Sequence, residues 1–502
     1  MPRPVDREGP DSVTTTVTLP AQRDLIDGQW SVPAELPEAP LCHPDTGELL
    51  QARTQTAPDA VHRAIAAAES LHRKGSWRTS PITDRIAFLR RVAAALEARL
   101  DEIAAADSLT SGVVRTVTGM FADGLPDVFR AAATRLAAEQ GEQSLSGSSG
   151  PVRLLHLPWG PTAVIAPWNA PTFTVAKKTA FALAAGAPVI AKPSGWAPSG
   201  PVLFAEVLAG AIADAEAPPA LFQLVHGDSE TGQLLAQDSR IRALAFTGGR
   251  VAGAEIARAA AGHSTALQLE LGSNNPVVVR ADADVAATAD ALVRGFTKLN
   301  GQWCESPGSV FVPAELHDAL RDAILDQLRT IRLGSCLDPT STMGPQANRP
   351  QFDRVADAVK RLTQDGATAT STTELPDLPG WFHAPAVVHD ADPGDTLDEI
   401  FGPVLTLHRT HSDREAVELA NRCHTGLAGY VFGTDLDAAF VLGAELDCGE
   451  VKINGTSVLD LHPESTQGFW GGSGTGAHGD AELLRFFRGA RIVGVDNPAF
   501  PI

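Results

Sequence analysis

Thr162-Ala163-Val164-Ile165-Ala166 is a short apolar run that leads directly into the turn Pro167-Trp168-Asn169. Four further short apolar runs follow along the chain, separated by segments of helical pattern, at residues 188–191, 221–225, 243–246 and 266–269. Strands that alternate with helices in this way are typical of a parallel sheet. The sequence therefore predicts an α/β domain built on these runs.

Polar and glycine residues lie just past the ends of these runs. They are Trp168, Asn169, Lys192, His226, Gly227, Thr247 and Gly248. Ligands of parallel sheets bind at the carboxyl ends of the strands. We therefore expect one cleft to collect these side chains.

A second alternation of strands and helices begins at residues 276–279 and continues through 309–312, 404–407 and 430–432, which predicts a second α/β domain. Apolar residues three and four apart predict one amphipathic helix over residues 80–103, after a shorter helix near 61–71. The Ser- and Gly-rich residues 141–150 predict a linker that enters a strand or hairpin.

Composition narrows the classes of partner. The chain has 502 residues and a formal net charge of -20, which argues against nucleic acid or an anionic membrane surface as the main partner. No apolar run reaches the roughly 18 to 20 residues that span a bilayer. The first twenty residues lack an apolar signal core, so we expect no secretory signal and a disordered tail.

The cysteines point to a reducing compartment. There are five, widely spaced and without metal-ligand spacing: Cys42, Cys304, Cys336, Cys423 and Cys448. We expect neither structural disulfides nor a metal site, and a cytoplasmic location.

Three residues could serve one chemical site. Cys304 is a thiol that could attack a carbonyl, Glu270 a carboxylate that could act as a base, and Asn169 an amide that could donate to an oxyanion. Taken singly, each has a structural explanation: Cys304 as a small buried hydrophobe, Glu270 as a solvated strand end and Asn169 as a turn residue.

The order of the sequence motifs resembles the aldehyde dehydrogenase superfamily from about residue 25 to about residue 490. The motifs are Leu25-Ile26-Asp27-Gly28-Gln29-Trp30, His43-Pro44-Asp45-Thr46-Gly47, Pro167-Trp168-Asn169, Lys192-Pro193-Ser194, Phe246-Thr247-Gly248-Gly249, Leu269-Glu270-Leu271-Gly272, Gly301-Gln302-Trp303-Cys304, Glu399-Ile400-Phe401-Gly402-Pro403 and Val451-Lys452-Ile453-Asn454-Gly455.

The resemblance implies an α/β fold of three parts after a disordered tail at residues 1–20. Residues 21–141 and 160–269 would form a parallel-sheet dinucleotide-binding domain, and residues 270–481 an α/β catalytic domain. Residues 142–159 and 482–502 would form a small β oligomerisation arm. A homodimer or homotetramer is the expected assembly.

The implied activity is oxidation of an aldehyde to the carboxylic acid, with hydride transfer to NAD or NADP. Cys304 would be the nucleophile, Asn169 and the Cys304 N–H the oxyanion donors, and Glu270 the base that activates water on the thioester. Lys178 would relay protons or orient Asn169, unless it is only a solvated helix lysine beside Lys177. The alternatives are a semialdehyde or coenzyme A-acylating relative, which Glu270 argues against, and a non-catalytic structural or nucleotide-binding member.

For the cofactor, the resemblance implies that Lys192 and Glu399 hold the two riboses, and that Gly248 and Gly249 face the pyrophosphate at a helix N-terminus. The full predicted cofactor set is Trp168, Lys192, Ser194, Gly195, Gly227, Phe246, Thr247, Gly248, Gly249, Arg250, Gly253, Leu271, Glu399 and Phe401.

One departure concerns the cofactor. The family commonly has Glu after Lys-Pro-Ser, where it binds the adenosine ribose and repels a 2′-phosphate, but this chain has Gly195. Arg250 also stands where Thr is more usual. We hypothesise that NADP is tolerated, with the preference between NAD and NADP open. The alternative is that Gly195 only eases a turn and that Arg250 points to solvent.

Other departures concern the substrate. The segment Phe469-Trp470-Gly471-Gly472-Ser473-Gly474-Thr475-Gly476 is shortened and lacks the lysine of the family pattern, next to the expected substrate tunnel. Glu305 is unusual directly after the nucleophile, and we expect it to point away from the thiol. Ala170 and Trp303 suggest a pocket for a bulky or aromatic aldehyde, whose identity the sequence leaves open.

Overall fold

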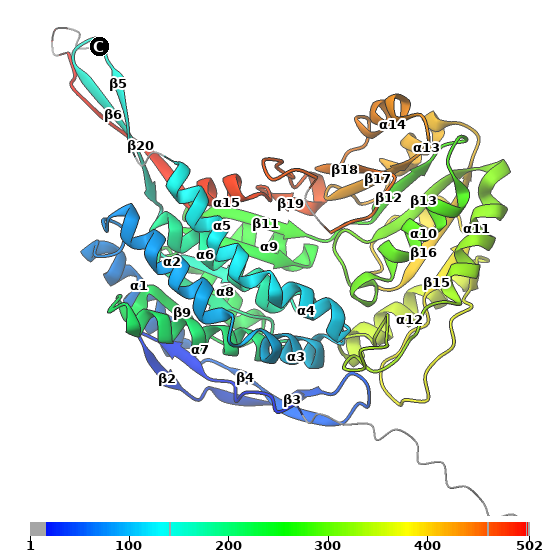
Figure 1. The fold of residues 1–502 in the computed structure, drawn as a ribbon, viewed down its shortest axis with the longest axis horizontal. Helices are drawn as coiled ribbons and strands as arrows, with labels where there is room; N and C mark the ends of the chain where they lie inside the picture. Colours follow the sequence, from blue (N-terminus) through cyan, green and yellow to red (C-terminus); the bar gives the residue numbers. More distant parts are fainter. Residues whose placement is uncertain (1–16, 140–141, 459–460, 498, 500–502) are drawn as a thin grey trace, which may run out of the picture.

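The computed structural model of the chain describes residues 17–139, 142–458, 461–497 and 499 (Figure 1). Most of the tail predicted to be disordered, residues 1–16, lies outside the described residues. No helix of the described part of the chain has the length and apolarity needed to cross a membrane.

The first sheet contains the predicted parallel strands. Strands β7 to β11 are mutually parallel, and they correspond to the apolar runs beginning at Thr162, so that prediction is confirmed. Among the described residues the sheet has eight strands in the order β19 (Gly474–Thr475), β11 (Ala266–Leu271), β10 (Ala243–Gly248), β7 (Thr162–Ile165), β8 (Val189–Lys192), β9 (Phe222–Leu224), β1 (Asp24–Ile26) and β2 (Gln29–Ser31).

Helices cover this sheet and bury a common core. Alanine-rich α6 and α7 are buried over most of their length between this sheet and the neighbouring helices, because small side chains let the elements approach closely. The helices are α1 (Pro58–Lys74), α2 (Ile82–Leu96), α3 (Leu100–Ser111), α4 (Arg115–Asp123), α5 (Leu125–Ala138), α6 (Pro171–Ala185), α7 (Ser199–Asp214), α8 (Ser229–Gln237) and α9 (Arg250–Ala261).

The single helix predicted over residues 80–103 is wrong, since the structure has two helices there. Arg99 leaves the helical region between α2 and α3 (φ -122°, ψ 5°) and pairs with Glu102 and Glu206 at 3.0 and 3.2 Å. Leu96 and Ile103 still enter the same core. The apolar spacing therefore runs through the break and hides it from a periodicity argument.

The second sheet confirms the second alternation. Strands β12, β13, β16 and β17 are the predicted runs and pair in parallel. In the described chain its order is β14 (Thr368–Thr370), β15 (Ala386–His389), β16 (Val404–Thr410), β13 (Pro307–Pro313), β12 (Asn275–Val279), β17 (Ala428–Phe432) and β18 (Glu450–Ile453). Its helices are α10 (Val285–Phe296), α11 (Ala314–Leu328), α12 (Arg349–Gln364), α13 (Asp413–Ala420) and α14 (Leu436–Gly443).

Two antiparallel sheets complete the fold. β3 (Ala34–Cys42) pairs with β4 (Leu49–Gln55) beneath the first sheet. β5 (Glu142–Ser146), β6 (Pro151–Pro158) and β20 (Arg488–Gly494) form a ribbon that projects from the body (Figure 1). β6 is the strand predicted after the Ser- and Gly-rich segment, but residues 142–146 of the predicted linker are themselves a strand, β5, which pairs with β6.

The segment after residue 470 needs one correction. The predicted division places residues 474–475 with the second domain, but β19 pairs with β11 in the first sheet, Thr475 opposite Leu269 and Gly474 opposite Glu270. Gly474 permits this approach, because a Cβ there would lie 1.8 Å from the Leu269 carbonyl oxygen. α15 (Asp480–Phe486) then packs against α5 and α6. The C-terminal segment thus lies beside β11, the strand that carries Glu270.

Candidate active site

A tightly held loop presents Cys304. Before it, Leu299, Asn300 and Gly301 adopt positive φ angles of 49°, 61° and 76°. The Asn300 side chain fixes this turn, donating to the carbonyls of Gly112 (2.7 Å) and Pro345 (2.8 Å). The strained turn is therefore anchored from both sides, which makes it a rigid support for the thiol.

Cys304 and Glu270 lie together as predicted. Cys304 Sγ is 3.9 Å from Glu270 Oε1, across 34 residues of sequence. Glu270 is at the end of β11, and the hydroxyl of Thr247, at the end of neighbouring β10, donates to its Oε2 at 3.1 Å. Parallel pairing of β10 and β11 thus brings both side chains to one edge of the sheet.

Lys178 on α6 is buried and not a solvated helix lysine. Its Nζ donates to Gln268 Oε1 at 2.5 Å and lies 3.9 Å from Glu270 Oε2. Burial lowers its pKa to about 8, against the attraction of Glu270, which raises the pKa. The cation is therefore placed to stabilise the Glu270 carboxylate.

Asn169 reaches the cysteine loop. It follows β7, and its Nδ2 donates to the Gln302 carbonyl at 2.8 Å, two residues before Cys304. The structure thus brings all four predicted catalytic residues, Asn169, Lys178, Glu270 and Cys304, into one cluster.

In the resting site Glu270 is ionised and the Cys304 thiol is protonated. Burial raises the pKa of Glu270, but His478, Lys178 and Thr247 together outweigh it and bring the pKa to about 2. Burial, followed by the charges of Glu270, Glu305 and Glu399, raises the pKa of the Cys304 thiol well above its usual value. The resting pair is therefore a carboxylate facing a thiol.

Glu305 is held by Lys452, whose Nζ lies 3.6 Å from its Oε2. Its backbone carbonyl accepts from the Tyr430 hydroxyl at 2.5 Å. This ion pair with Lys452 therefore compensates the negative charge of Glu305, the residue that follows the nucleophile.

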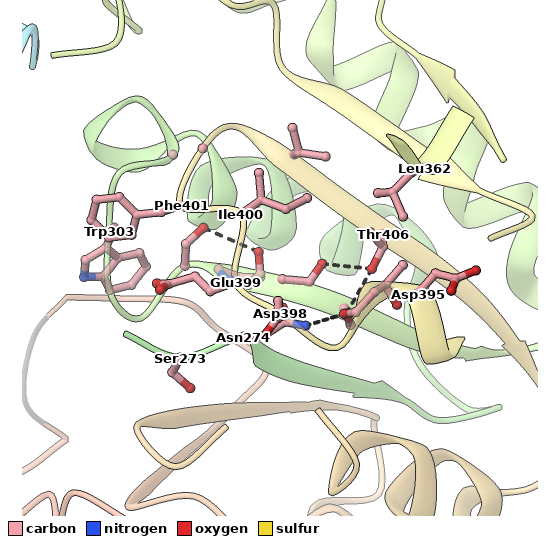
Figure 2. A pocket seen from close by; sticks show the side chains of 18 of the residues that line it. Ser273, Asn274, Trp303, Leu362, Asp395, Asp398, Glu399, Ile400, Phe401 and Thr406 are labelled. Carbon is pink, nitrogen blue, oxygen red and sulfur yellow. Dashed lines mark hydrogen bonds between the residues drawn. The ribbon is translucent and has the colours of Figure 1, made fainter. Parts of the chain in front are cut away.

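Glu399 and Phe401 line a pocket beside the cysteine loop. Figure 2 shows them with Trp303, facing Ser273 and Asn274 from the start of the second sheet. Burial raises the pKa of Glu399 to about 7, and its Oε1 is buried without a hydrogen-bond partner among the described residues. A ribose hydroxyl is the kind of donor that such an oxygen lacks.

The other predicted ribose contact, Lys192, ends β8. It is buried, which lowers its pKa to about 8, and its Nζ donates to the Pro193 carbonyl at 3.2 Å. Asp228 and Arg53 also act on it electrostatically. Nearby, Ser194 Oγ accepts from the Trp196 N–H, and Gly227 takes a φ of 131° at the turn into α8.

Glycines keep the start of α9 open. β10 ends at Gly248 and α9 begins at Arg250. A Cβ on Gly248 would lie 2.5 Å from Phe246, and one on Gly253 would lie 2.4 Å from Leu271. Gly248 and Gly253 thus let the backbone pack closely on Phe246 and Leu271, while a Cβ on Gly249 would meet nothing within 4 Å, which leaves room for a pyrophosphate at the helix N-terminus.

Arg250 has partners that the sequence did not indicate. A Cβ on Gly472 would lie 2.8 Å from its Nη2, and its charge lowers the pKa of Glu399. The guanidinium therefore lies by the C-terminal segment and Glu399. The rings of Trp168 and Phe401, both in the predicted cofactor set, meet edge-to-face with their centres 5.4 Å apart.

Asp228 is a site residue that the sequence reasoning missed. Its carboxylate forms a two-point ion pair with Arg53, at 2.7 and 3.2 Å, and the Arg53 guanidinium lies 4.2 Å over the Trp196 ring. A Cβ on Gly195 would lie 2.6 Å from Asp228 Oδ1. The carboxylate absent at position 195 is thus replaced by one from the β9–α8 turn.

His478 is the second missed residue. It lies two residues after the shortened segment, and its Nε2 is 2.9 Å from Glu270 Oε1. As one of fourteen scattered histidines it carried no distinguishing signal in the sequence. Within the described residues, no cluster of three or more His, Cys, Asp or Glu is placed to hold a metal ion.

Known proteins share both the sequence and the fold. The model of the aldehyde dehydrogenase family matches residues 30–493. The chain is 33% identical to a geranial dehydrogenase of Castellaniella defragrans, over 88% of this chain and 92% of the relative. It is 29% identical to a betaine aldehyde dehydrogenase of Bacillus subtilis, over 90% of this chain and 92% of the relative.

Solved structures of aldehyde dehydrogenases are similar to this chain in fold. A betaine aldehyde dehydrogenase of Staphylococcus aureus in complex with NAD+ superposes with a TM-score of 0.87 at 26% identity, over 94% of both chains. A variant of aldehyde dehydrogenase C of Pseudomonas syringae, in complex with NAD+ and octanal, gives a TM-score of 0.87 at 28% identity, over 94% of this chain and 96% of the other. By sequence and fold alike, the chain belongs to the aldehyde dehydrogenase family.

Proposed function

We propose that Cys304, Glu270, Asn169 and Lys178 carry out the NAD(P)-dependent oxidation of an aldehyde to its carboxylic acid. Family membership makes the protein an oxidoreductase of aldehydes that uses a nicotinamide cofactor. One observation carries the assignment of roles: a thiol on a rigid loop lies 3.9 Å from a buried carboxylate. That is the spacing expected of a nucleophile and a base before substrate tightens the site.

In the first half-reaction Cys304 Sγ bonds to the aldehyde carbon, and the thiol proton is released to solvent. The carbonyl electrons move to oxygen, where the Asn169 amide and the Cys304 N–H stabilise the charge. The bound nicotinamide cofactor supplies the hydride acceptor. When the carbon–oxygen double bond re-forms with loss of hydride, a thioester remains on Cys304.

In the second half-reaction Glu270 takes a proton from water, whose oxygen bonds to the thioester carbon. The carbon–sulfur bond then breaks, Cys304 regains a proton and the acid leaves. Transfer of the acyl group to coenzyme A needs no such base. The buried Glu270 therefore favours hydrolysis over the coenzyme A-acylating alternative, and a reachable thiol and base together disfavour a non-catalytic member.

The cofactor would be held at three places: Lys192 and Asp228 at the adenosine ribose, the Gly248–Gly249 turn at the pyrophosphate, and Glu399 at the nicotinamide ribose. The unpartnered Glu399 oxygen and the open start of α9 support this placement.

The surroundings of Cys304 favour an apolar aldehyde. Cys304 packs, together with Val117, Phe121 and Val458, against one apolar cluster of Val113, Leu299 and Trp303. The face of Trp303 is already covered by a cation, Lys298 Nζ, at 4.1 Å from the ring centre. A cationic aldehyde that needs an aromatic face would meet that charge, so substrates of the geranial or octanal type fit better than betaine aldehyde.

The test is nicotinamide reduction at 340 nm with octanal, geranial, benzaldehyde and betaine aldehyde, with NAD and with NADP, in the parent and in Cys304→Ala. Reduction with the apolar aldehydes that is lost in the variant supports the proposal. Undiminished reduction in Cys304→Ala contradicts the assigned nucleophile.

We also propose a homodimer or homotetramer in the cytoplasm. The ribbon of β5, β6 and β20 leaves Leu145, Ile492 and Val493 exposed, and exposed apolar strands of this kind suit pairing with another subunit. Light scattering coupled to size exclusion would give the mass directly, and a monomer would contradict the proposed assembly.

A further inference from the structure

The C-terminal segment delivers His478 to the catalytic carboxylate. β19 pairs with β11 up to Glu270, and Gln268 Nε2 donates to the Ala477 carbonyl at 2.7 Å. The His478 backbone N–H donates to the Gln467 carbonyl at 2.8 Å, and the imidazole and the Phe469 ring meet edge-to-face with their centres 4.9 Å apart. The ring is thus fixed by strand pairing, backbone and aromatic contact.

The partly buried imidazole and the buried carboxylate form a close pair. Nε2 lies 2.9 Å from Oε1, and the two side chains are 23% and 8% exposed. The other ring nitrogen, Nδ1, is buried and has no partner in the described structure. Burying an N–H without an acceptor is costly, so the proton belongs on Nε2, where it is donated to Glu270.

The two oxygens of Glu270 are thereby divided. Oε1 faces His478 and Cys304, and Oε2 faces Thr247 and Lys178. Among the described residues, Lys178, Cys304 and His478 are the titratable groups that contact the carboxylate. Lys177 and Asp480, the next charged groups on α6 and α15, pair with one another at 3.9 Å. His478 is the donor on the oxygen that faces the thiol.

We propose that His478 is the positioning residue of the general base: its Nε2–H holds Glu270 Oε1 toward Cys304 and keeps the carboxylate ionised for water activation. The proposal rests on the proposed function, since it assigns His478 to the hydrolysis step. No proton leaves the imidazole. The water proton goes to Glu270, and the hydrogen bond from His478 keeps that carboxyl in line with the thioester.

The first test is the pH dependence of kcat in the parent, His478→Gln and His478→Ala, with His411→Gln on the surface as a matched control. Gln keeps an N–H donor near the place of Nε2, whereas Ala removes it. Losing a favourable partner moves a carboxylate pKa by roughly one to three units. In His478→Ala we expect the low-pH limb of the kcat–pH profile to move to higher pH by about one unit or more. The shift should be smaller in His478→Gln and absent in the control.

A second readout needs no aldehyde. Without His478, the Glu270 charge acts on the thiol with less compensation, so alkylation of Cys304 by iodoacetamide at pH 8 is expected to slow several-fold in His478→Ala and less in His478→Gln. Equal acid limbs and equal alkylation rates in all variants would overturn the role of His478, even if kcat fell. Absence of aldehyde oxidation in the parent, with the alkylation difference retained, would instead count against the proposed function alone.

Discussion

The Asp228 carboxylate occupies the space that a side chain on Gly195 would need, since a Cβ there would lie 2.6 Å from Asp228 Oδ1. The hypothesis of NADP tolerance rested on a missing negative charge at position 195. The charge is present, but it comes from the turn before α8. Because Arg53 is already paired with Asp228, its guanidinium is not free for a 2′-phosphate, and we therefore expect NAD to bind more tightly than NADP.

Asp228→Asn is therefore expected to change the nucleotide preference. The substitution removes the charge that repels a 2′-phosphate and releases Arg53, so NADP should bind roughly tenfold more tightly, or about 1.4 kcal/mol. Quenching of tryptophan fluorescence by NAD and NADP gives both dissociation constants, with the exposed Asp357→Asn as control. An unchanged ratio of the two constants in Asp228→Asn would contradict the assignment, and Arg53→Ala in the Asn background should abolish the gain.

Lys178→Met is expected to impair turnover and to remove a pH-dependent cost to stability. Burial holds the pKa of Lys178 at about 8, below its unfolded value of 10.5. Between these values the unfolded chain binds the extra proton, so this group's contribution to stability rises with pH from about 8 to 10.5. The Tm difference between variant and parent should be largest at pH 7 and shrink as the pH passes 8. A difference that is constant across this range would show that Lys178 is not a buried cation.

The sequence allowed prediction of the parallel strands, because short apolar runs are local signals, and its resemblance to the family implied that Asn169, Glu270 and Cys304 share one site. It did not allow prediction of Asp228 and His478. Asp228 follows a glycine in an ordinary turn, and His478 stands alone in a glycine-rich stretch. Both come near the site through contacts between distant segments, Asp228 with Arg53 and β19 with β11. The break between α2 and α3 could not be predicted because Leu96 before it and Ile103 after it pack into one core, so the apolar spacing continues across the break.

Glu270→Gln is expected to separate the two half-reactions. The amide cannot take a proton from water, so the thioester should form and then persist. Rapid mixing should show a burst of reduced nicotinamide close to one per active site, followed by steady turnover reduced by about 10²- to 10⁴-fold. Glu315→Gln, exposed at the start of α11, is the matched control. Loss of the burst itself would place Glu270 in the first half-reaction, and unimpaired steady turnover would remove it from the mechanism.

Lys298→Met is expected to open the site to cationic aldehydes. The Lys298 ammonium lies 4.1 Å over the Trp303 ring, beside the nucleophile, and burial lowers its pKa to about 8, so it is largely charged at neutral pH. Removing it frees the ring face for a quaternary ammonium group, a contact of about 0.5–2 kcal/mol. We therefore expect kcat/KM for betaine aldehyde to rise several-fold at pH 7, while that for octanal changes little. Lys360→Met, exposed on α12, controls for loss of a lysine. An equal change for both aldehydes would mean that Lys298 acts on the fold of the loop and not on the charge of the substrate.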